Sequence, residues 1–185
     1  MQWHNGWCDR ARRCPSPNFN ERPHNCEVDL LVIHCISLPP GEFGGDYIEQ
    51  FFTNQLSPGA HPYFEEIAAM QVSAHFLIRR TGELVQFVSC LDRAWHAGAS
   101  EFCGRNNCND FSIGIELEGT DEDGFEAEQY TTLADLTRSL MQQFEGISIN
   151  NIVGHEDIAP GRKTDPGPGF DWEHYRSLLS EEVPH

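Results

Sequence analysis

The sequence predicts an α/β or α+β domain built around one β-sheet. Short apolar runs of strand length recur along the chain, and segments with helical spacing of apolar residues lie between them. A chain of 185 residues that is 39% hydrophobic is also long enough for one domain with a core of its own. We find no internal repeat and no indication of a second domain.

Charge and cysteine content restrict the possible partners and the compartment. The 12 basic and 29 acidic residues give a net charge of −17, which disfavours binding to nucleic acid or to an anionic membrane surface. The first residues contain no apolar run typical of a secretion signal, and no stretch approaches the roughly 20 apolar residues that cross a bilayer. The seven cysteines lack the paired C-x2-C spacing of a structural zinc site, so reduced thiols in a cytoplasm are favoured.

The first strand is expected at residues 29–34. Residues 1–28 show no sustained period and are expected to form an irregular segment packed on a domain that spans residues 29–185. Residues 29–34 form a short apolar run that is typical of a strand buried on both faces, and His34 stands at its exit. Because a sheet fixes the direction of side chains at strand ends, His34 is a candidate metal ligand, the alternative being a histidine buried in the core.

Residues 37–70 are long for a connection between two strands. A loop rich in proline and glycine over 37–45 precedes a helix expected to start near Asp46, and residues 61–70 predict another short helix. We expect this segment to wall or cover a site. Residues 72–80 and 84–88 then predict a hairpin that turns at Gly82, with His75 in a structural role.

Two further segments contain candidate site residues. Trp95 and His96 lie beside small residues, which suits a cleft wall that contacts substrate, although Trp95 in the core and His96 in solvent is the alternative. Residues 110–119 alternate strictly, so Glu116 shares a face with small residues. A carboxylate with open space beside it can take a proton from water at a metal, and a solvated strand face is the alternative.

The remaining elements lead to the last loop. The acidic run 121–128 reads as a solvated surface, residues 128–144 predict a helix that stops near Gly146, and residues 171–179 predict a closing helix. Residues 151–153 predict a short strand that leads to His155.

The loop 154–167 has the composition of a metal site. It contains His155, Asp165 and Lys163, the only lysine in the protein, and prolines stiffen it. A neutral imidazole and a carboxylate are ligands that zinc accepts in a catalytic site. Because ten residues separate His155 from Asp165, the loop has to fold back on itself, and we expect His34 to supply the third ligand.

These residues carry a resemblance to a known family. His34, the strand with Glu116, and His155 with Lys163 and Asp165 resemble the zinc site of the N-acetylmuramoyl-L-alanine amidase type 2 family. The resemblance covers roughly residues 15–180 and is carried further by the following stretches: 36–45, 93–98, 109–120 and 162–167.

The resemblance implies a fold, a cofactor and a reaction. The expected fold is a single mixed β-sheet flanked by helices, shared with peptidoglycan recognition proteins and phage T7 lysozyme, with Zn²⁺ held by His34, His155 and Asp165. The expected reaction is that of the family members that hydrolyse the amide between the lactyl group of 1,6-anhydro-N-acetylmuramic acid and L-alanine in muropeptides, during cytoplasmic cell-wall recycling. A small muropeptide is then the only partner required, without a protein partner.

The resemblance also implies roles for individual residues. Glu116 would act as the proton acceptor and donor, in place of a tyrosine that the T7 lysozyme branch has where this chain has Ala74. That branch has a cysteine ligand where this chain has Asp165, and Cys35 replaces an asparagine of close relatives, which affects one substrate contact. Lys163 would stabilise the oxyanion together with zinc.

We expect the substrate-binding residues to be Trp95, His96 and Arg162. The alternatives are a non-catalytic module that recognises peptidoglycan fragments and a zinc amidase of intact wall peptidoglycan.

Overall fold

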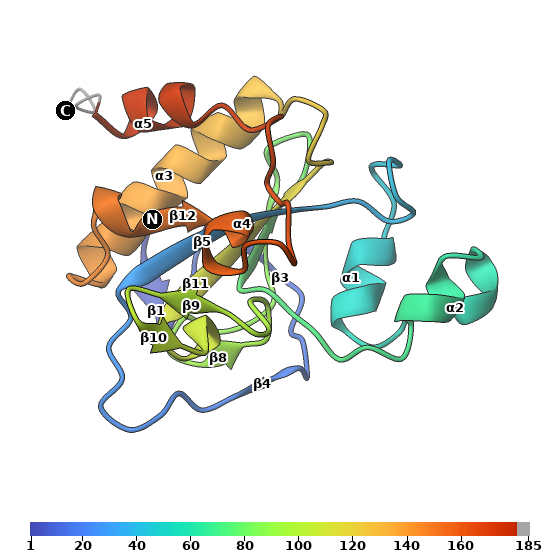
Figure 1. Ribbon diagram of the computed structural model, residues 1–185, viewed down its shortest axis with the longest axis horizontal. Coiled ribbons are helices and arrows are strands. Elements are labelled where there is room, and N and C mark those ends of the chain that lie inside the picture. Colours follow the sequence, from blue (N-terminus) through green and yellow to red (C-terminus); the bar gives the residue numbers. More distant parts are fainter. Residues whose placement is uncertain (181–185) are drawn as a thin grey trace.

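A six-stranded mixed sheet forms the centre of the computed structural model, which describes residues 1–180 (Figure 1). Its strand order is β12-β5-β11-β6-β7-β3, and the four strands from β12 to β6 run parallel to one another. β7 is antiparallel to β6, and β3 runs parallel to β7. The strands span Arg12–Arg13 (β3), Leu30–Ile36 (β5), Phe76–Ile78 (β6), Leu84–Gln86 (β7), Ser112–Glu118 (β11) and Ile152–Gly154 (β12). The predicted single mixed sheet is confirmed.

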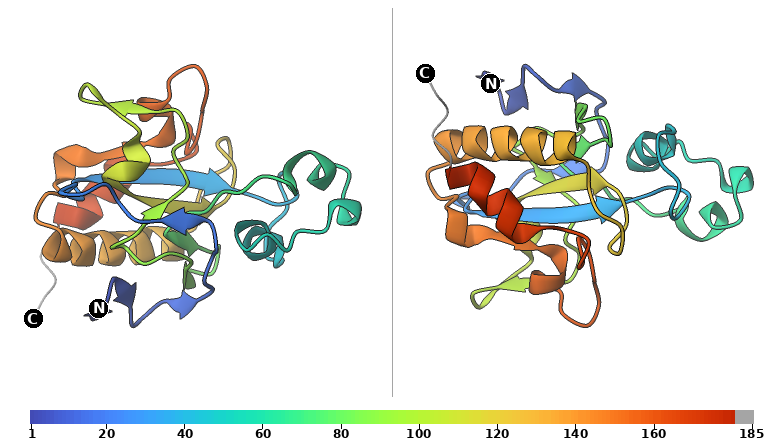
Figure 2. Two further views of the ribbon diagram at one scale, coloured as in Figure 1. Left: turned by 90° about the horizontal axis from the view of Figure 1, so that it is seen from below. Right: turned by 90° about the horizontal axis from the view of Figure 1, so that it is seen from above.

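Helices cover both faces of this sheet. α3 and α5 pack along one face and α4 lies on the opposite face, whereas α1 and α2 lie beyond the end of β5 (Figure 2). The helices span Tyr47–Phe52 (α1), Phe64–Ile67 (α2), Ala127–Gln143 (α3), His155–Ile158 (α4) and Trp172–Ser180 (α5), with single 3₁₀ turns at Pro58–Ala60 (η1), Cys108–Asp110 (η2) and Ile149–Asn151 (η3).

The alternation of side chains along β5 and β11 divides the core. Leu31 and Ile33 of β5 pack with Ile115 of β11 in the cluster formed with α3. Leu30 and Val32 face the other way, into a cluster that includes Ile158 of α4. Because successive side chains of a strand point to opposite faces, the even-numbered residues of β5 and β11 lie away from α3. This places His34 and Glu116 on the same face of the sheet.

The N-terminal segment contains more structure than the expected coil. It has four two-residue strands, Trp3–His4 (β1), Trp7–Cys8 (β2), β3 and Phe19–Asn20 (β4). β3 is an edge strand of the central sheet, and β4 pairs with β8 (Arg93–Ala94). The expectation of coil for 1–28 was wrong here because strands of two residues depend on distant partners and leave no period in the sequence. How the chain divides into folding units stays a prediction, and residues 181–185 lie outside the described residues.

The other predicted elements agree with the structure. α1 follows Asp46, α2 lies within 61–70, α3 begins and ends within a residue of its prediction, and α5 matches 171–179. The hairpin of β6 and β7 turns at Gly82, whose φ is +80°. A further small hairpin, Glu101–Phe102 (β9) with Arg105–Asn106 (β10), and the short helix α4 were not predicted. Within residues 1–180, no helix is long and apolar enough to cross a membrane.

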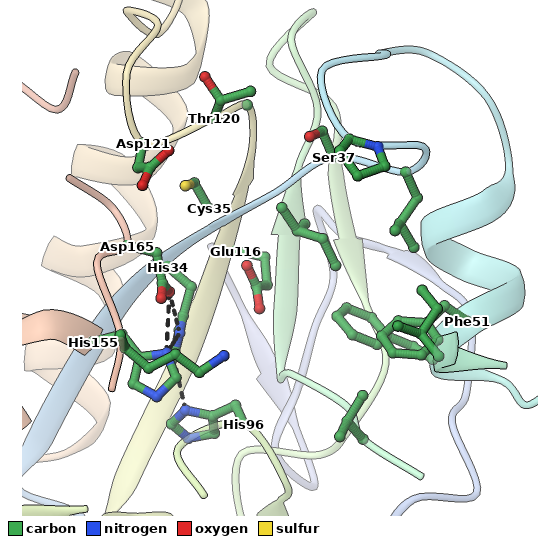
Figure 3. Close-up of a pocket in the computed structure, with 18 of the residues that line it drawn as sticks. His34, Cys35, Ser37, Phe51, His96, Glu116, Thr120, Asp121, His155 and Asp165 are labelled. Atoms are coloured by element: carbon green, nitrogen blue, oxygen red, sulfur yellow. Dashed lines mark hydrogen bonds and ion pairs between the residues drawn. The ribbon is translucent and has the colours of Figure 1, made fainter. Parts of the chain in front are cut away.

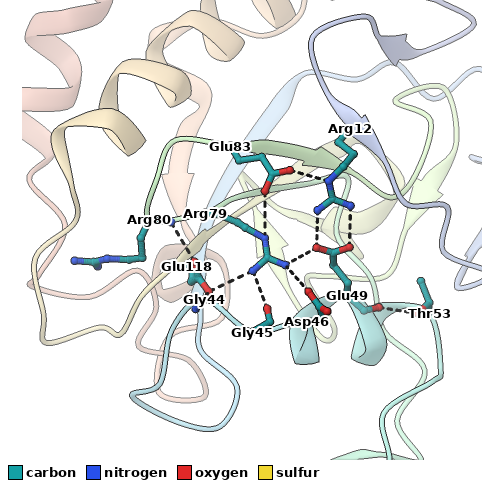
Figure 4. Close-up of polar contacts among 10 residues, drawn as sticks. All are labelled: Arg12, Gly44, Gly45, Asp46, Glu49, Thr53, Arg79, Arg80, Glu83 and Glu118. Atoms are coloured by element: carbon teal, nitrogen blue, oxygen red, sulfur yellow. Dashed lines mark hydrogen bonds and ion pairs between the residues drawn. The ribbon is translucent and has the colours of Figure 1, made fainter.

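A network of charged side chains ties α1 to the sheet (Figure 4). Arg12 of β3 makes a two-point contact with Glu49 of α1, at 2.7 and 3.0 Å, and Arg79 also binds Glu49. These hydrogen bonds, first of all those from Arg12, lower the pKa of Glu49 to about 2. Glu118 at the end of β11 accepts a hydrogen bond from the backbone N–H of Gly44 at 2.7 Å. The segment that begins at residue 37 is therefore held to the sheet at several points.

Candidate metal centre

Three adjacent parallel strands bring the predicted site residues together. Glu116 of β11 is paired with His34 of the adjacent parallel strand β5. Gly154 of β12 is paired with Ile33, so His155 follows at the same level on the other side of His34. Carboxyl ends of parallel strands are where α/β sheets place ligand sites. The chain thus delivers two imidazoles and a carboxylate to one end of the sheet.

Asp165 completes a cluster of three donor atoms, shown in Figure 3. His34 Nδ1 lies 3.0 Å from His155 Nδ1 and 3.0 Å from Asp165 Oδ2, and His155 Nδ1 lies 3.1 Å from the same oxygen. Both histidines are buried, and the carboxylate side chain is 16% exposed. Among residues 1–180, this is the group of His, Cys, Asp and Glu side chains arranged to hold a metal ion.

The loop that carries Asp165 contacts Asp121, the first residue of the acidic run 121–128. Thr164 Oγ1 donates to Asp121 Oδ2 at 2.8 Å, and the N–H of Gly169 donates to the Asp121 carbonyl at 2.9 Å. A Cβ on Gly167 would lie 2.4 Å from the Cβ of Asp121, so only glycine permits this contact. The interpretation of 121–128 as a merely solvated surface was wrong for Asp121, because a charge run in a sequence does not show which member a distant loop will contact.

The protonation states of the cluster suit a cation. Burial lowers the pKa of His34 to about 4, so its imidazole is neutral at neutral pH. Burial alone would raise the pKa of Asp165, but hydrogen bonds to His155 and His34 hold it well below its ordinary value. Metal binding needs a neutral imidazole and an ionised carboxylate, and the site provides both near pH 7.

Hydrogen-bond directions also favour a cation between these atoms. His155 Nε2 lies 3.1 Å from the carbonyl oxygen of Ala97, which can only accept, so that nitrogen carries the proton of the neutral ring. When the ring is neutral in this tautomer, the Nδ1 lone pair faces Asp165 Oδ2 at 3.1 Å, and a cation can take the place of the proton that otherwise bridges the two atoms. Donor atoms of a tetrahedral zinc site lie about 3.3 Å apart, given bonds of about 2.0–2.1 Å, so the observed spacing fits zinc after a small expansion.

Glu116 points toward this cluster from β11 (Figure 3). The residue is 9% exposed, and its Oε2 is a buried atom without a hydrogen-bond partner. Burial, and then the charge of Asp165, raise the pKa of Glu116 well above its ordinary value, while Lys163 acts in the opposite direction. A carboxyl group with a raised pKa and a free oxygen is suited to proton transfer.

A cavity of about 450 Å³ opens beside the cluster. Its wall includes the three residues of the candidate metal cluster, together with Glu116, Lys163, Trp95 and His96, and apolar side chains of α1 and α2 such as Phe51 and Ile67. The prediction that segment 37–70 walls the site is confirmed. This volume is in the range of small-molecule sites, roughly 300–1,000 Å³.

The other predicted site residues lie at different positions relative to the cavity. The side chain of Trp95 is partly exposed in the cavity wall, and its Nε1 donates to Asn20 at 2.8 Å. Arg162 is not among the cavity-lining residues, because its guanidinium donates to the carbonyls of Ala97 and Ala99, each at 2.7 Å. The ring of His96 lies against His34 with both nitrogens near protein atoms. Substrate contact by these three residues stays a prediction.

Sequence reasoning missed the residues behind the candidate ligands. The carbonyl of Ala97 and the side chains of Ser112, Asn109 and Asp121 left no motif, since each acts through one hydrogen bond to a distant segment. Gly114 did give a signal. Gly114 has no side chain on the face of β11 that carries Glu116, as predicted, but the ring of His96 fills the space above it.

His75 is structural, as predicted, and it makes stability depend on pH. Its Nδ1 accepts from the N–H of Gly114 at 3.1 Å, and burial lowers its pKa to about 3. Between about pH 6.5 and pH 3, His75 therefore binds a proton in the unfolded chain but not in the folded protein. The free energy of unfolding falls as the pH falls.

We predict that His75→Asn flattens this dependence. The amide oxygen of asparagine can still accept from Gly114, but it does not titrate. The slope of unfolding free energy against pH should be smaller by up to about 1.4 kcal/mol per pH unit between pH 6 and pH 4. Urea unfolding of both proteins at several pH values measures it. Parallel slopes would show that His75 does not remain neutral in the folded state.

Comparison with known proteins identifies the family to which the chain belongs. The family model described as N-acetylmuramoyl-L-alanine amidase matches residues 24–168, and the chain belongs to this family. The predicted resemblance is confirmed. One relative is 1,6-anhydro-N-acetylmuramyl-L-alanine amidase AmpD of Escherichia coli (strain K12), 56% identical over 178 residues that cover 96% of this chain and 97% of that protein.

Solved structures show the same similarity. A crystal structure of a selenomethionine derivative of AmpD superposes with a TM-score of 0.95 at 54% identity and covers 97% of this chain and 100% of that one. The amidase AmiD from E. coli, solved with the substrate anhydro-N-acetylmuramic acid-L-Ala-D-γ-Glu-L-Lys, superposes with a TM-score of 0.62 at 27% identity, over 85% of this chain and 60% of that one.

Proposed function

We propose that this protein is a zinc-dependent amidase that cleaves the bond between the lactyl group of 1,6-anhydro-N-acetylmuramic acid and L-alanine in muropeptides. The observation that carries the proposal is the cluster of His34, His155 and Asp165 beside Glu116, in a chain similar to AmpD over nearly its whole length. The seven cysteines are all free thiols, which supports a role in cytoplasmic cell-wall recycling.

The ligands and the residues around them have separate tasks. His34, His155 and Asp165 would hold zinc, which supplies a Lewis acid that polarises an amide carbonyl and acidifies water. Glu116, whose buried Oε2 has no hydrogen-bond partner, would take the proton of the attacking water and return it to the amine of L-alanine as that amine leaves. Lys163 would place a positive charge near the oxyanion.

The cavity supports a small substrate. Its apolar wall from α1 and α2 can exclude water from a bound sugar and peptide, while polar contacts at the cluster orient the amide. A muropeptide carries carboxylates and would be repelled by a protein of net charge −17 unless the site is locally positive. Zinc and Lys163 would provide that local charge.

The test is hydrolysis of anhydromuramyl tripeptide by the purified protein, followed by mass analysis for free tripeptide. We expect release in the zinc-loaded protein, none after removal of metal by a chelator, and recovery when zinc is restored. Intact peptidoglycan sacculi serve as the second substrate. Release from sacculi at an equal rate would favour a wall amidase, and no release from either substrate would favour a non-catalytic recognition module.

Lys163→Ala should lower kcat by about 10² to 10³, the typical loss when one oxyanion donor is removed. The side chain of Lys163 is exposed, so the variant should fold and bind zinc as the parent does. Arg10→Ala is the matched control, because it removes one exposed positive charge remote from the cavity and changes the net charge equally. If kcat is unchanged in Lys163→Ala, the oxyanion role is wrong.

A further inference from the structure

Both candidate ligand histidines contact one short segment with the ring nitrogen that faces away from the cluster. His34 Nε2 lies 2.9 Å from His96 Nδ1, and His155 Nε2 lies 3.1 Å from the carbonyl oxygen of Ala97. The two partners are consecutive in the chain. The same segment therefore supports two histidines that come from different strands.

The hydrogen bonds through His96 have a defined direction. A metal bound through His34 Nδ1 requires that this ring carries its proton on Nε2, so His96 Nδ1 has to accept. The neutral ring of His96 then carries its proton on Nε2, which lies 3.1 Å from Ser112 Oγ and can donate to it. Each nitrogen of His96 thus has one protein partner, and neither is left for a substrate.

The ring of His96 occupies a place that the sheet leaves open for it. A Cβ on Gly114 would lie 2.5 Å from both Cγ and Nδ1 of His96. Gly114 stands between Ser112 and Glu116 on the face of β11 that carries the site. The glycine therefore allows the ring to lie flat on the strand, within reach of His34 on β5.

The backbone of the segment is held by Asn109. Its Oδ1 accepts from the N–H of His96 at 3.0 Å and from the N–H of Ala97 at 2.8 Å. The Asn109 side chain is buried, and its own carbonyl accepts from Arg22 at 3.1 Å. One amide oxygen thus fixes both the residue that contacts His34 and the residue that contacts His155.

We propose that His96 is a positioning residue that fixes the tautomer and orientation of His34, and that Asn109 holds the segment from which it acts. Outer partners of this kind direct the lone pair of a ligand histidine toward the metal. The inference rests on the proposed function in one respect, that His34 binds zinc. It gives His96, whose ring borders the cavity, a role behind the candidate metal ligand.

The test compares His96→Asn with His96→Phe. The Oδ1 of asparagine can take the place of Nδ1 and accept from His34, whereas phenylalanine fills the space on Gly114 without accepting. Zinc affinity of each purified apoprotein is measured by competition with a chelating indicator. We expect His96→Phe to bind zinc about 10 to 100 times more weakly than wild type, and His96→Asn to remain within about threefold. His24→Phe, an exposed histidine, is the matched control.

The kinetic readout separates positioning from substrate binding. With zinc in saturating excess, His96→Phe should have the KM of wild type, because both ring nitrogens of His96 are engaged by protein atoms. Equal zinc affinity in His96→Phe with a raised KM would overturn the inference in favour of substrate contact. Equal weakening in His96→Asn and His96→Phe would also overturn it, since the accepting atom would then not matter.

A second pair of variants decides the matter if His96→Phe fails to fold. Asn109→Asp keeps an oxygen that accepts both backbone N–H groups, whereas Asn109→Ala removes it. We expect about tenfold weaker zinc binding in Asn109→Ala and wild-type binding in Asn109→Asp, and identical affinities in the two would overturn the inference. Wild-type protein that binds no zinc would overturn the proposed function itself, and the wild-type measurement alone reveals that outcome.

Discussion

Asp165→Ala should lose zinc and amidase activity together while the apoprotein remains folded. The carboxylate is the one anionic member of the cluster, and its Oδ2 lies 3.0 and 3.1 Å from the two histidine nitrogens. Without it, two imidazoles remain, and zinc affinity should fall by more than about 100-fold, beyond the loss typical of an outer partner. Metal content after dialysis and hydrolysis of anhydromuramyl tripeptide measure the two effects.

Thermal unfolding distinguishes loss of metal from loss of fold in this variant. In chelator neither protein contains metal, so the difference between their unfolding temperatures measures what the contacts of the carboxylate with the two histidines contribute to the apoprotein. Added zinc at about 100 times its dissociation constant should stabilise the wild type by about 2.7 kcal/mol and leave the variant unchanged. Glu173→Gln on α5 removes an exposed negative charge and should behave as wild type. A purified Asp165→Ala protein that retains one zinc per chain would remove Asp165 from the ligand set.

The sequence indicated the candidate ligands more readily than the residues that hold them. His34, His155 and Asp165 follow strands or lie in a loop rich in proline, and their residue types indicate metal chemistry without any structure. The strict alternation of β11 also placed Glu116 correctly, because a period of two determines which face a side chain occupies. These features are local, so they are readable from neighbouring residues.

The features that could not be predicted depend on distant pairs. β3 joins the central sheet through two residues beside β7, about 70 positions away in the chain. Asp121 holds the metal loop through Thr164, although its neighbours in the sequence suggested only a solvated surface. Asn109 carries no motif, because its role arises from the position of its amide oxygen between two N–H groups of another segment.

Glu116→Gln should lower kcat by about 10² to 10⁴, the usual contribution of a general acid and base. The substitution keeps the shape of the side chain and removes its ability to accept a proton. Zinc binding should be retained, because the carboxylate is not among the three donor atoms of the cluster. The measurement is single-turnover hydrolysis by protein of verified zinc content, and a kcat equal to that of wild type would exclude Glu116 as the proton acceptor.

The same substitution should stabilise the apoprotein at neutral pH. Burial raises the folded-state pKa of Glu116 well above its unfolded value, so between these two pKa values the folded protein binds the extra proton. The free energy of unfolding of the wild type therefore falls as the pH rises through that window, and the stability is fully present only below the ordinary pKa of glutamate, about 4.3. Glutamine does not titrate, so the free energy of unfolding of the variant does not contain this pH-dependent loss.

Urea unfolding of metal-free wild type and Glu116→Gln at pH 4 and pH 7 tests the argument. We expect the variant to gain stability relative to wild type as the pH rises, with the difference larger at pH 7 than at pH 4. Such a result, together with the loss of kcat, would show that the buried carboxylate is kept for proton transfer at a cost in stability. If instead the variant is less stable at pH 7 than at pH 4 relative to wild type, Glu116 is ionised and stabilised in the folded protein, and its raised pKa does not contribute to catalysis.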